Sequence, residues 1–185
     1  ITNQLSFTAW VFLDTGCETG SCTIFQGEFS VSSTANRNAG FLVETKGKVL
    51  NYIVADGSMS GDDGLYTSSG YTIPLSVWVH VGVVHRSGAV LFYKNAIFHS
   101  AVNLVINTTS ISFNGNDYEH DSYFMGKYWR GGGESFFTSA PYGMGFFSGR
   151  LYNVGLWNRP LSLQDLYAVM SSPSTAMDGQ AFWRL

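Results

Sequence analysis

Residues 76–99 read SVWVHVGVVHRSGAVLFYKNAIFH, and this stretch decides the fold class. Its first half, 77–86, is apolar on both faces, which is typical of a central strand in a sheet. Ser87 and Gly88 then supply a turn, and an aromatic-rich strand, AVLFYKN, follows it. The stretch therefore predicts a β-hairpin at the centre of a sheet.

The same signals recur on both sides of this hairpin. In LSFTAWVFL (5–13), odd-numbered apolar positions share one face, whereas Trp10 and Phe12 lie on the other. Lys46, Gly47 and Lys48 separate two β-rich runs and predict another hairpin. Further strands are predicted within 122–127, within 143–159 and at 179–185.

Only PLSLQDLYAVMSS has helical spacing. Ser162 can cap this segment, and Asp165 follows three residues later, so we predict one short helix near 162–171. Many short strands with Gly-rich turns and one helix predict an all-β fold, an antiparallel sandwich of two sheets.

The composition of the 185 residues fits one domain spanning 1–185. Hydrophobic residues make up 45% and charged residues only 12%, against the roughly 25% charged residues usual in soluble domains. The net charge is −3 and the basic residues are scattered, so we expect no nucleic-acid partner. No apolar run reaches the ~20 residues of a membrane span, so no membrane insertion is expected. The start, ITNQLSF, suggests a domain excised from a larger protein.

Two motifs resemble the laminin G-like, concanavalin A-like jelly rolls, a superfamily that includes pentraxin-like domains. The family typically shows Trp, a His two residues later, an apolar strand, a short turn and a strand ending in Tyr-x-Asn-Gly. Residues 76–99 follow this order at Trp78, His80, Val81, Val83, Val84, Leu91, Tyr93 and Asn95. FFSGRLYNVGLWNRPLS matches a second family signature at Phe147, Gly149, Leu151, Val154, Leu156, Trp157, Asn158, Arg159, Leu161 and Ser162. The resemblance implies a lectin/glucanase-type jelly roll.

The chain departs from this pattern at two positions. Ala96 replaces the usual Gly, and because Asn-Gly turns use positive φ, we expect a different turn or a longer loop there. Asn153 stands where the family commonly has Asp, so no role of that acid is carried over.

Cys17 and Cys22 are the only cysteines, in CETGSC. A disulfide between them would staple a short loop and indicate an oxidising compartment, whereas two free thiols are the alternative. Asn107 begins an Asn-Thr-Thr glycosylation sequon, which favours an extracellular or cell-surface location.

A Gly-rich segment, KYWRGGGESFF (127–137), is the predicted ligand loop. It lacks the Lys-Ser/Thr of a phosphate-binding loop. Aromatic faces with a polar edge suit sugars, whereas the alternative is that the glycines let Trp129 fold back over the core. The other four tryptophans lie in strand-like segments that a core could absorb. The predicted ligand residues are Tyr128, Trp129, Arg130, Glu134 and Tyr142.

Calcium is the one cofactor that the sequence raises. Carboxylates and amide oxygens cluster in NGNDYEHD, as calcium requires, and many laminin G-like and pentraxin-like domains bind calcium in loops at a sandwich edge. The alternative is a solvated loop rich in turn residues. A second acidic loop, at 56–64, resembles an EF-hand only at its start. The predicted ligands are Asn116, Asp117, Glu119 and Asp121.

We therefore expect a non-catalytic extracellular recognition or adhesion domain that binds a glycan or a surface protein through edge loops, beside neighbouring domains of the same chain. His80 is expected as a hydrogen-bonded core residue and His85 as a strand cap. Related β-glucanases carry a Glu-x-Asp-x-x-Glu strand, and EHDSYF (119–124) lacks its final carboxylate, which disfavours an enzyme. A purely structural module and a degenerate glycoside hydrolase are the alternatives.

Overall fold

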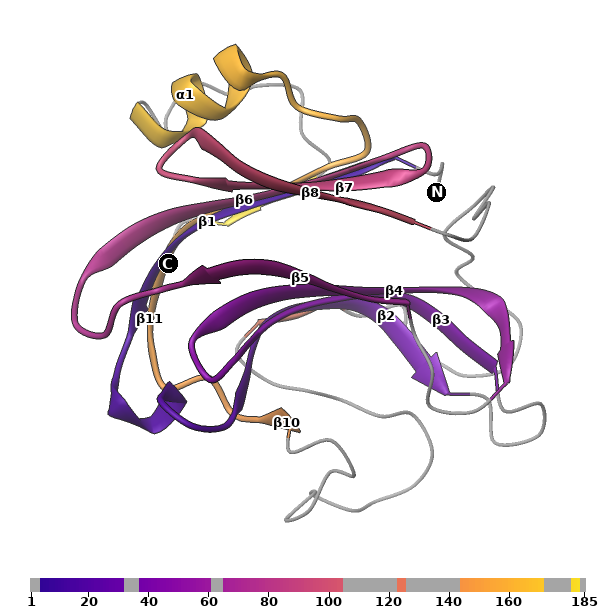
Figure 1. Ribbon diagram of the computed structural model, residues 1–185, viewed down its shortest axis with the longest axis horizontal. Helices are drawn as coiled ribbons and strands as arrows, with labels where there is room; N and C mark the ends of the chain where they lie inside the picture. Colours follow the sequence, from indigo (N-terminus) through magenta and orange to yellow (C-terminus); the bar gives the residue numbers. More distant parts are fainter. Residues whose placement is uncertain are drawn as a thin grey trace.

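The computed structural model of the chain describes residues 4–31, 37–60, 65–104, 123–125, 144–171 and 181–183. Two sheets face each other, and one helix lies on the outer side of the first sheet (Figure 1). The elements are β1 (Leu5–Leu13), η1 (Thr15–Cys17), β2 (Ser21–Val31), β3 (Arg37–Lys46), β4 (Val49–Ser60), β5 (Leu65–Thr72), β6 (Trp78–Arg86), β7 (Ala89–Lys94), β8 (Ile97–Asn103), β9 (Tyr123–Met125), β10 (Met144–Gly145), β11 (Gly149–Trp157), α1 (Leu163–Ser171) and β12 (Ala181–Trp183).

Sheet A has the order β12-β11-β1-β6-β7-β8, and sheet B has the order β10-β2-β3-β4-β5, with β9 also paired to β2. Among the described strands every ladder is antiparallel except the two-residue pairing of β10 with β2. The predicted two-sheet jelly-roll sandwich is therefore confirmed, and the strand at 77–86 is interior, as expected.

The core lies between the sheets because alternate residues of each strand point inward. Odd-numbered residues of β1 are buried, and they meet the inner residues of β2, β3 and β4. Phe25 stacks on Phe41 at 5.8 Å between ring centroids and lies 5.3 Å from Phe7 of the opposite sheet. The two sheets are thus joined mainly by aromatic and aliphatic packing.

The helix begins where the sequence predicts. The Asp165 N–H donates to Ser162 Oγ (3.1 Å), and the Ser162 N–H donates to Asp165 Oδ2 (2.9 Å), which is a reciprocal capping box. Ser6 fixes the entry to the helix, because its hydroxyl donates to the Arg159 carbonyl and accepts from the Leu161 N–H. No helix among the described residues is long and apolar enough to span a membrane.

The turn between β7 and β8 differs from the expectation. Asn95 and Ala96 both take positive φ, 52° and 58°, and the pairing of Lys94 with Ile97 closes a two-residue turn. The predicted change of turn at Ala96 is therefore wrong. Ala96 is 3% exposed and packs with Tyr93, so burial of its methyl group offsets the strain of the left-handed conformation.

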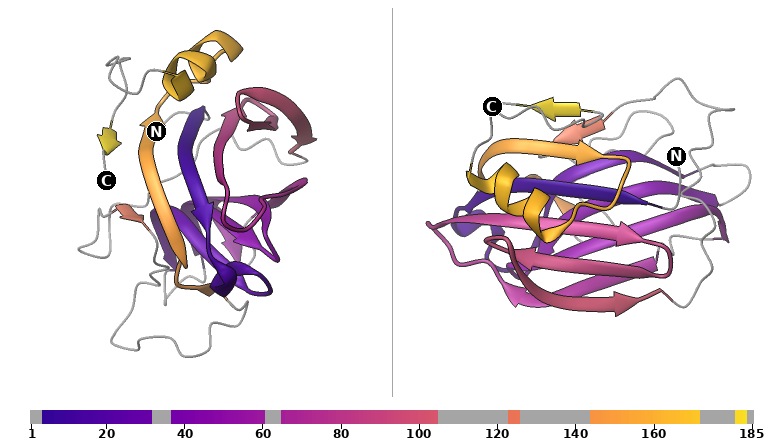
Figure 2. Two further views of the ribbon diagram at one scale, coloured as in Figure 1. Left: turned by 90° about the vertical axis from the view of Figure 1, so that its left-hand side faces the viewer. Right: turned by 90° about the horizontal axis from the view of Figure 1, so that it is seen from above.

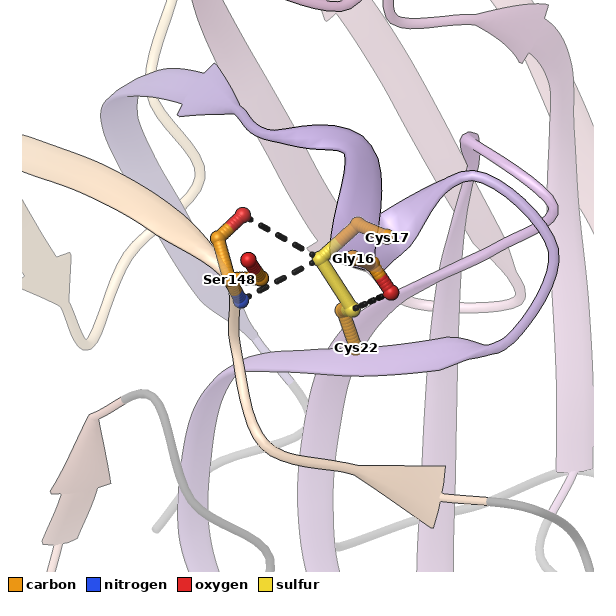
Figure 3. The surroundings of a disulfide bond; sticks show 4 residues. All are labelled: Gly16, Cys17, Cys22 and Ser148. Carbon is orange, nitrogen blue, oxygen red and sulfur yellow. Dashed lines mark hydrogen bonds between the residues drawn. A yellow bond between two sulfur atoms is a disulfide. The ribbon is translucent and has the colours of Figure 1, made fainter.

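A disulfide between Cys17 and Cys22 is confirmed, and it closes the corner where the chain passes from sheet A to sheet B (Figure 3). The Ser148 N–H donates to Cys17 Sγ (3.2 Å). The Ser148 carbonyl lies 3.3 Å from the same sulfur, a contact rather than a hydrogen bond, because an oxidised sulfur carries no proton. Ser148 lies between β10 of sheet B and β11 of sheet A, so this connection between the sheets meets the one from β1 to β2 at the bridge.

Reduction of this bridge is expected to lower the free energy of unfolding by about 2 kcal/mol, because a loop this short constrains the unfolded chain only modestly. Urea unfolding of the oxidised and reduced protein measures the difference. The double variant Cys17→Ser/Cys22→Ser is the control and should not respond to reductant. Coincident curves for the oxidised and reduced protein would show that the bridge contributes no stability.

Candidate functional site

The outer face of sheet A carries a group of mostly aromatic side chains, some of them exposed. On β1, inward packing of Val11 and Leu13 turns Trp10 and Phe12 outward. Phe12 pairs with Arg150 of β11 on one side and with Trp78 of β6 on the other. In the next row, Trp10 pairs with a β11 and a β6 residue in the same way. The six side chains, called the aromatic platform below, are Trp10, Phe12, Trp78, His80, Arg150 and Tyr152.

A bulge in β11 gives Tyr152 its outward direction. The register with β1 shifts between Thr8 and Trp10, and Asn153 takes a φ of 49°. Tyr152 on one side of the bulge therefore faces outward, while Val154 on the other side enters the core. The left panel of Figure 2 looks onto β11 and β1 side by side below α1.

The platform combines exposed rings with an exposed guanidinium. Trp78 is 39% exposed and Tyr152 is 43% exposed, while Trp10 and Phe12 are half-buried. The Arg150 guanidinium carbon lies 4.1 Å from the centroid of the Phe12 ring, and Phe12 lies 5.5 Å from Trp78. Exposed apolar side chains that lie together on a protein surface often mark a binding site.

Two glycines lie on sheet A between the platform and the area that helix α1 covers. Leu166 of α1 packs against the backbone of Gly82, and the indole of Trp157 lies over Gly155. A Cβ at either glycine would meet these side chains, so the glycines let Leu166 and Trp157 lie close to the sheet. The part of the face beyond these glycines carries the platform.

His80 is the buried member of the platform and lies beside Trp10. It is 1% exposed, its ring lies 5.4 Å from the Trp10 ring, and neither ring nitrogen has a hydrogen-bond partner among the described residues. Burial lowers the pKa of His80 to about 4, so the ring is neutral at pH 7. His80 is therefore buried, as expected, but its ring does not make the expected hydrogen bonds with the described residues. The backbone N–H of His80 does donate to Asn95 Oδ1 (2.9 Å), which holds β6 to the following turn.

His85 is a core residue rather than the strand cap that we expected. It is 1% exposed, and its Nδ1 lies 3.1 Å from the hydroxyl of Tyr52, a buried residue of sheet B. Burial also lowers the pKa of His85 to about 4. Because its hydrogen-bond partner is on the opposite sheet, His85 helps to join the two sheets.

The outer face of sheet B carries a second group of polar side chains, in one row across four strands. Glu44 pairs with Thr23 of β2 and Asn51 of β4, and Asn51 pairs with Ser68 of β5. Glu44 Oε2, Thr23 Oγ1 and Asn51 Oδ1 are buried, and within the described part of the chain they have no hydrogen-bond partner. Burial raises the pKa of Glu44 to about 7, and the positive charge of Lys46 only partly opposes this shift.

This row does not contain the carboxylate pair of a glycosidase. Lys46 is the one charged group that shifts the pKa of Glu44, and no cluster of three or more His, Cys, Asp or Glu side chains occurs among the described residues. A retaining or inverting mechanism needs a second carboxyl group across the substrate. In the described part of the chain, Glu44 is therefore a single buried acid.

The predicted loop residues all lie outside the described residues, so their predictions stay open. These are the ligand residues Tyr128, Trp129, Arg130, Glu134 and Tyr142, the calcium residues Asn116, Asp117, Glu119 and Asp121, and the sequon residue Asn107. The platform was not predicted from the sequence, because Trp10 and Trp78 were treated as residues that the core could absorb. The alternation in 5–13, which sets Trp10 and Phe12 apart from the other apolar residues, was the signal that could have found it.

Comparison with solved structures supports the fold, whereas comparison with sequences identifies no family. No family model matches the sequence, and no curated protein matches it. A structure described as a candidate carbohydrate-binding protein from Bacteroides ovatus matches with a TM-score of 0.66 at 13% identity, over 99% of this chain and 45% of that one. The chain thus spans less than half the length of this match.

Two shorter proteins match over most of their length. CBM40 of the Ruminococcus gnavus IT-sialidase, bound to α2,3-sialyllactose, has a TM-score of 0.65 at 11% identity, over 92% of this chain and 84% of that one. A heptameric SAP-like pentraxin from Limulus polyphemus has a TM-score of 0.60 at 18% identity, over 100% of this chain and 80% of that one. The chain shares their jelly-roll fold.

Replacement of Glu44 by Gln is expected to change how stability depends on pH. The pKa of this carboxyl is 4.5 before burial and about 7 in the folded chain. The protonated carboxyl therefore contributes fully to the free energy of unfolding below pH 4.5. This contribution, on the order of 3 kcal/mol, is lost as the pH rises to 7. The two histidines act oppositely, and their contribution is lost as the pH falls from 6.5 to 4.

The difference in unfolding free energy between wild type and Glu44→Gln isolates the carboxyl, because both proteins keep the histidines. Urea unfolding from pH 4.5 to 8 should show wild type losing stability relative to the variant up to pH 7. Glu18→Gln, at an exposed carboxylate, tests whether removal of any one acid gives the same change. A constant difference across this range would contradict the assigned burial of Glu44.

Proposed function

We propose that this chain is a non-catalytic recognition domain that binds a glycan through the aromatic platform. The observation that carries the proposal is the exposure of Trp78 and Tyr152 beside Arg150 on a rigid sheet. Aromatic rings offer flat apolar faces to the C–H groups of a sugar, while nearby polar groups bond its hydroxyls. Strand residues hold these rings in place before the ligand arrives, so little conformational entropy is lost on binding.

The structural neighbours support a glycan as the ligand class. One is described as a candidate carbohydrate-binding protein, and another was solved with α2,3-sialyllactose. Within this proposal, the laminin G-like family remains our assignment from the two sequence motifs. Edge loops at Asn116–Asp121 and Tyr128–Tyr142 are proposed to extend the binding surface, with calcium held by the first of them.

The disulfide supports an extracellular or cell-surface location. Bridges of this kind persist in oxidising compartments and are rare in the cytosol. We propose that the chain works there beside other domains of a larger protein.

A protein partner is the second candidate, and a different surface favours it. Ile97 is 70% exposed and Phe98 is 51% exposed at the start of the edge strand β8. An apolar surface beside the free edge of a strand suits another protein better than a sugar. Ile97→Asp should abolish such an interaction and leave glycan binding unchanged, which a pull-down with candidate partners and a glycan titration would together measure.

Truncation of the platform is expected to weaken glycan binding. Trp78→Ala and Tyr152→Ala should each lower the affinity about tenfold, because large aromatic anchors commonly contribute more than 1.4 kcal/mol to binding. A glycan array identifies a ligand for the wild-type protein, and calorimetric titration then measures each variant. Tyr167→Ala is the matched control, since Tyr167 is 59% exposed on α1 outside the platform.

Two results would contradict the proposal. One is the absence of any glycan ligand for the folded wild-type protein. The other is an affinity that Trp78→Ala leaves unchanged while its melting temperature stays at the wild-type value. Repeating the array with EDTA tests the calcium loop separately, because the described platform contains no carboxylate.

A further inference from the structure

Arg150 is the one charged side chain of the platform, and its position is constrained. Its guanidinium lies over the Phe12 ring at 4.1 Å, a cation–π contact that orients the group while leaving Arg150 exposed. The backbone of Arg150 is held by its pairing with Phe12 in the β1–β11 ladder. The charge is therefore presented to solvent in a defined place beside the exposed rings.

No carboxylate of the described residues neutralises this charge. The ion pairs found there are Lys48 with Glu18 and Arg159 with Asp165, and Arg150 takes part in neither. Asp14 follows Phe12 by two residues, just after the end of β1, and it forms no ion pair with Arg150. Within the described part of the chain, no carboxylate therefore occupies the N–H donors of Arg150.

A guanidinium presents N–H donors in a planar fork, which matches two oxygens of one anionic group better than it matches separate hydroxyls. Sugars carry such groups as carboxylates or sulfate esters. The adjacent rings of Phe12 and Trp78, 5.5 Å apart, continue the surface away from the charge. One end of a saccharide could thus be recognised by charge and the remainder by stacking.

We infer that the platform selects acidic saccharides, and that Arg150 is the residue that binds their carboxylate or sulfate group. The inference rests on the proposed glycan-binding function and adds the ligand class to it. Asp14 follows Phe12 by two residues, so we expect its negative charge to oppose this selection in part.

The test uses pairs of ligands that differ only in charge. α2,3-Sialyllactose is compared with its carboxyl methyl ester, and an oligogalacturonate with its methyl ester, after an array of sialylated, uronic-acid, sulfated and neutral glycans. The acidic member of the best pair should bind the wild-type protein about tenfold more tightly. Its affinity should fall as NaCl is raised, because salt screens the charge.

Variants assign this selectivity to one residue. Arg150→Gln should remove the preference for the acidic ligand, and Arg150→Lys should restore only part of it, since lysine keeps the charge and lacks the fork. Arg86→Gln is the matched control and should change nothing. Arg86 is an exposed arginine at the far end of β6, eight residues and so roughly 26 Å from Trp78. Asp14→Asn should tighten acidic binding slightly.

The two proposals fail in different ways. If neutral and acidic ligands bind equally and only Trp78→Ala weakens them, selection by Arg150 is overturned and the proposed function stands. If sulfated but not carboxylated glycans bind and Arg150→Gln weakens them, the inference holds with sulfate as the group. If folded wild-type protein binds no glycan, both proposals are overturned.

Discussion

The pairing of β1 with β6 on one side and β11 on the other is the constraint on which the rest of the structure depends. It places Leu5, Phe7 and the following odd-numbered residues of β1 in the core, and all of them are at most 2% exposed. A strand alternates its side chains, so a slip of one residue would exchange its two faces. Trp10 and Phe12 would then enter the core, and the platform would not exist.

The same pairing keeps a group of aromatic side chains on the outer face of sheet A, outside the core. Helix α1 covers only one end of sheet A, where Gly82 and Gly155 let Leu166 and Trp157 lie against the sheet. At the other end no element among the described residues packs over Trp78 and Tyr152. The disulfide corner and Ser148 hold this end in place, because Arg150 follows Ser148 by two residues on β11.

Local signals in the sequence predicted the strands, turns and helix well. They failed where packing between strands determines the conformation or the burial of a residue. The Ser162–Asp165 capping box and the Gly88 turn depend on neighbouring residues alone, so the sequence suffices for them. Ala96 keeps a turn that its residue type disfavours, because its methyl group is buried in a cluster that also contains Trp157 and Leu161, which are distant in sequence. The two histidines were misjudged for a related reason, since their partners lie on other strands.

Alternation, turn residues and the capping box determined by themselves that this chain forms an all-β sandwich with one short helix, because each acts within a few residues. Which apolar face is covered was decided only by the tertiary structure. Trp10, Trp78 and Trp157 all lie in strands, yet only Trp157 is fully buried, since its indole lies over Gly155 and packs in one cluster with Leu166 and Val169 of the helix. Exposure depends on what another part of the chain places over a residue, and strand periodicity does not contain that information.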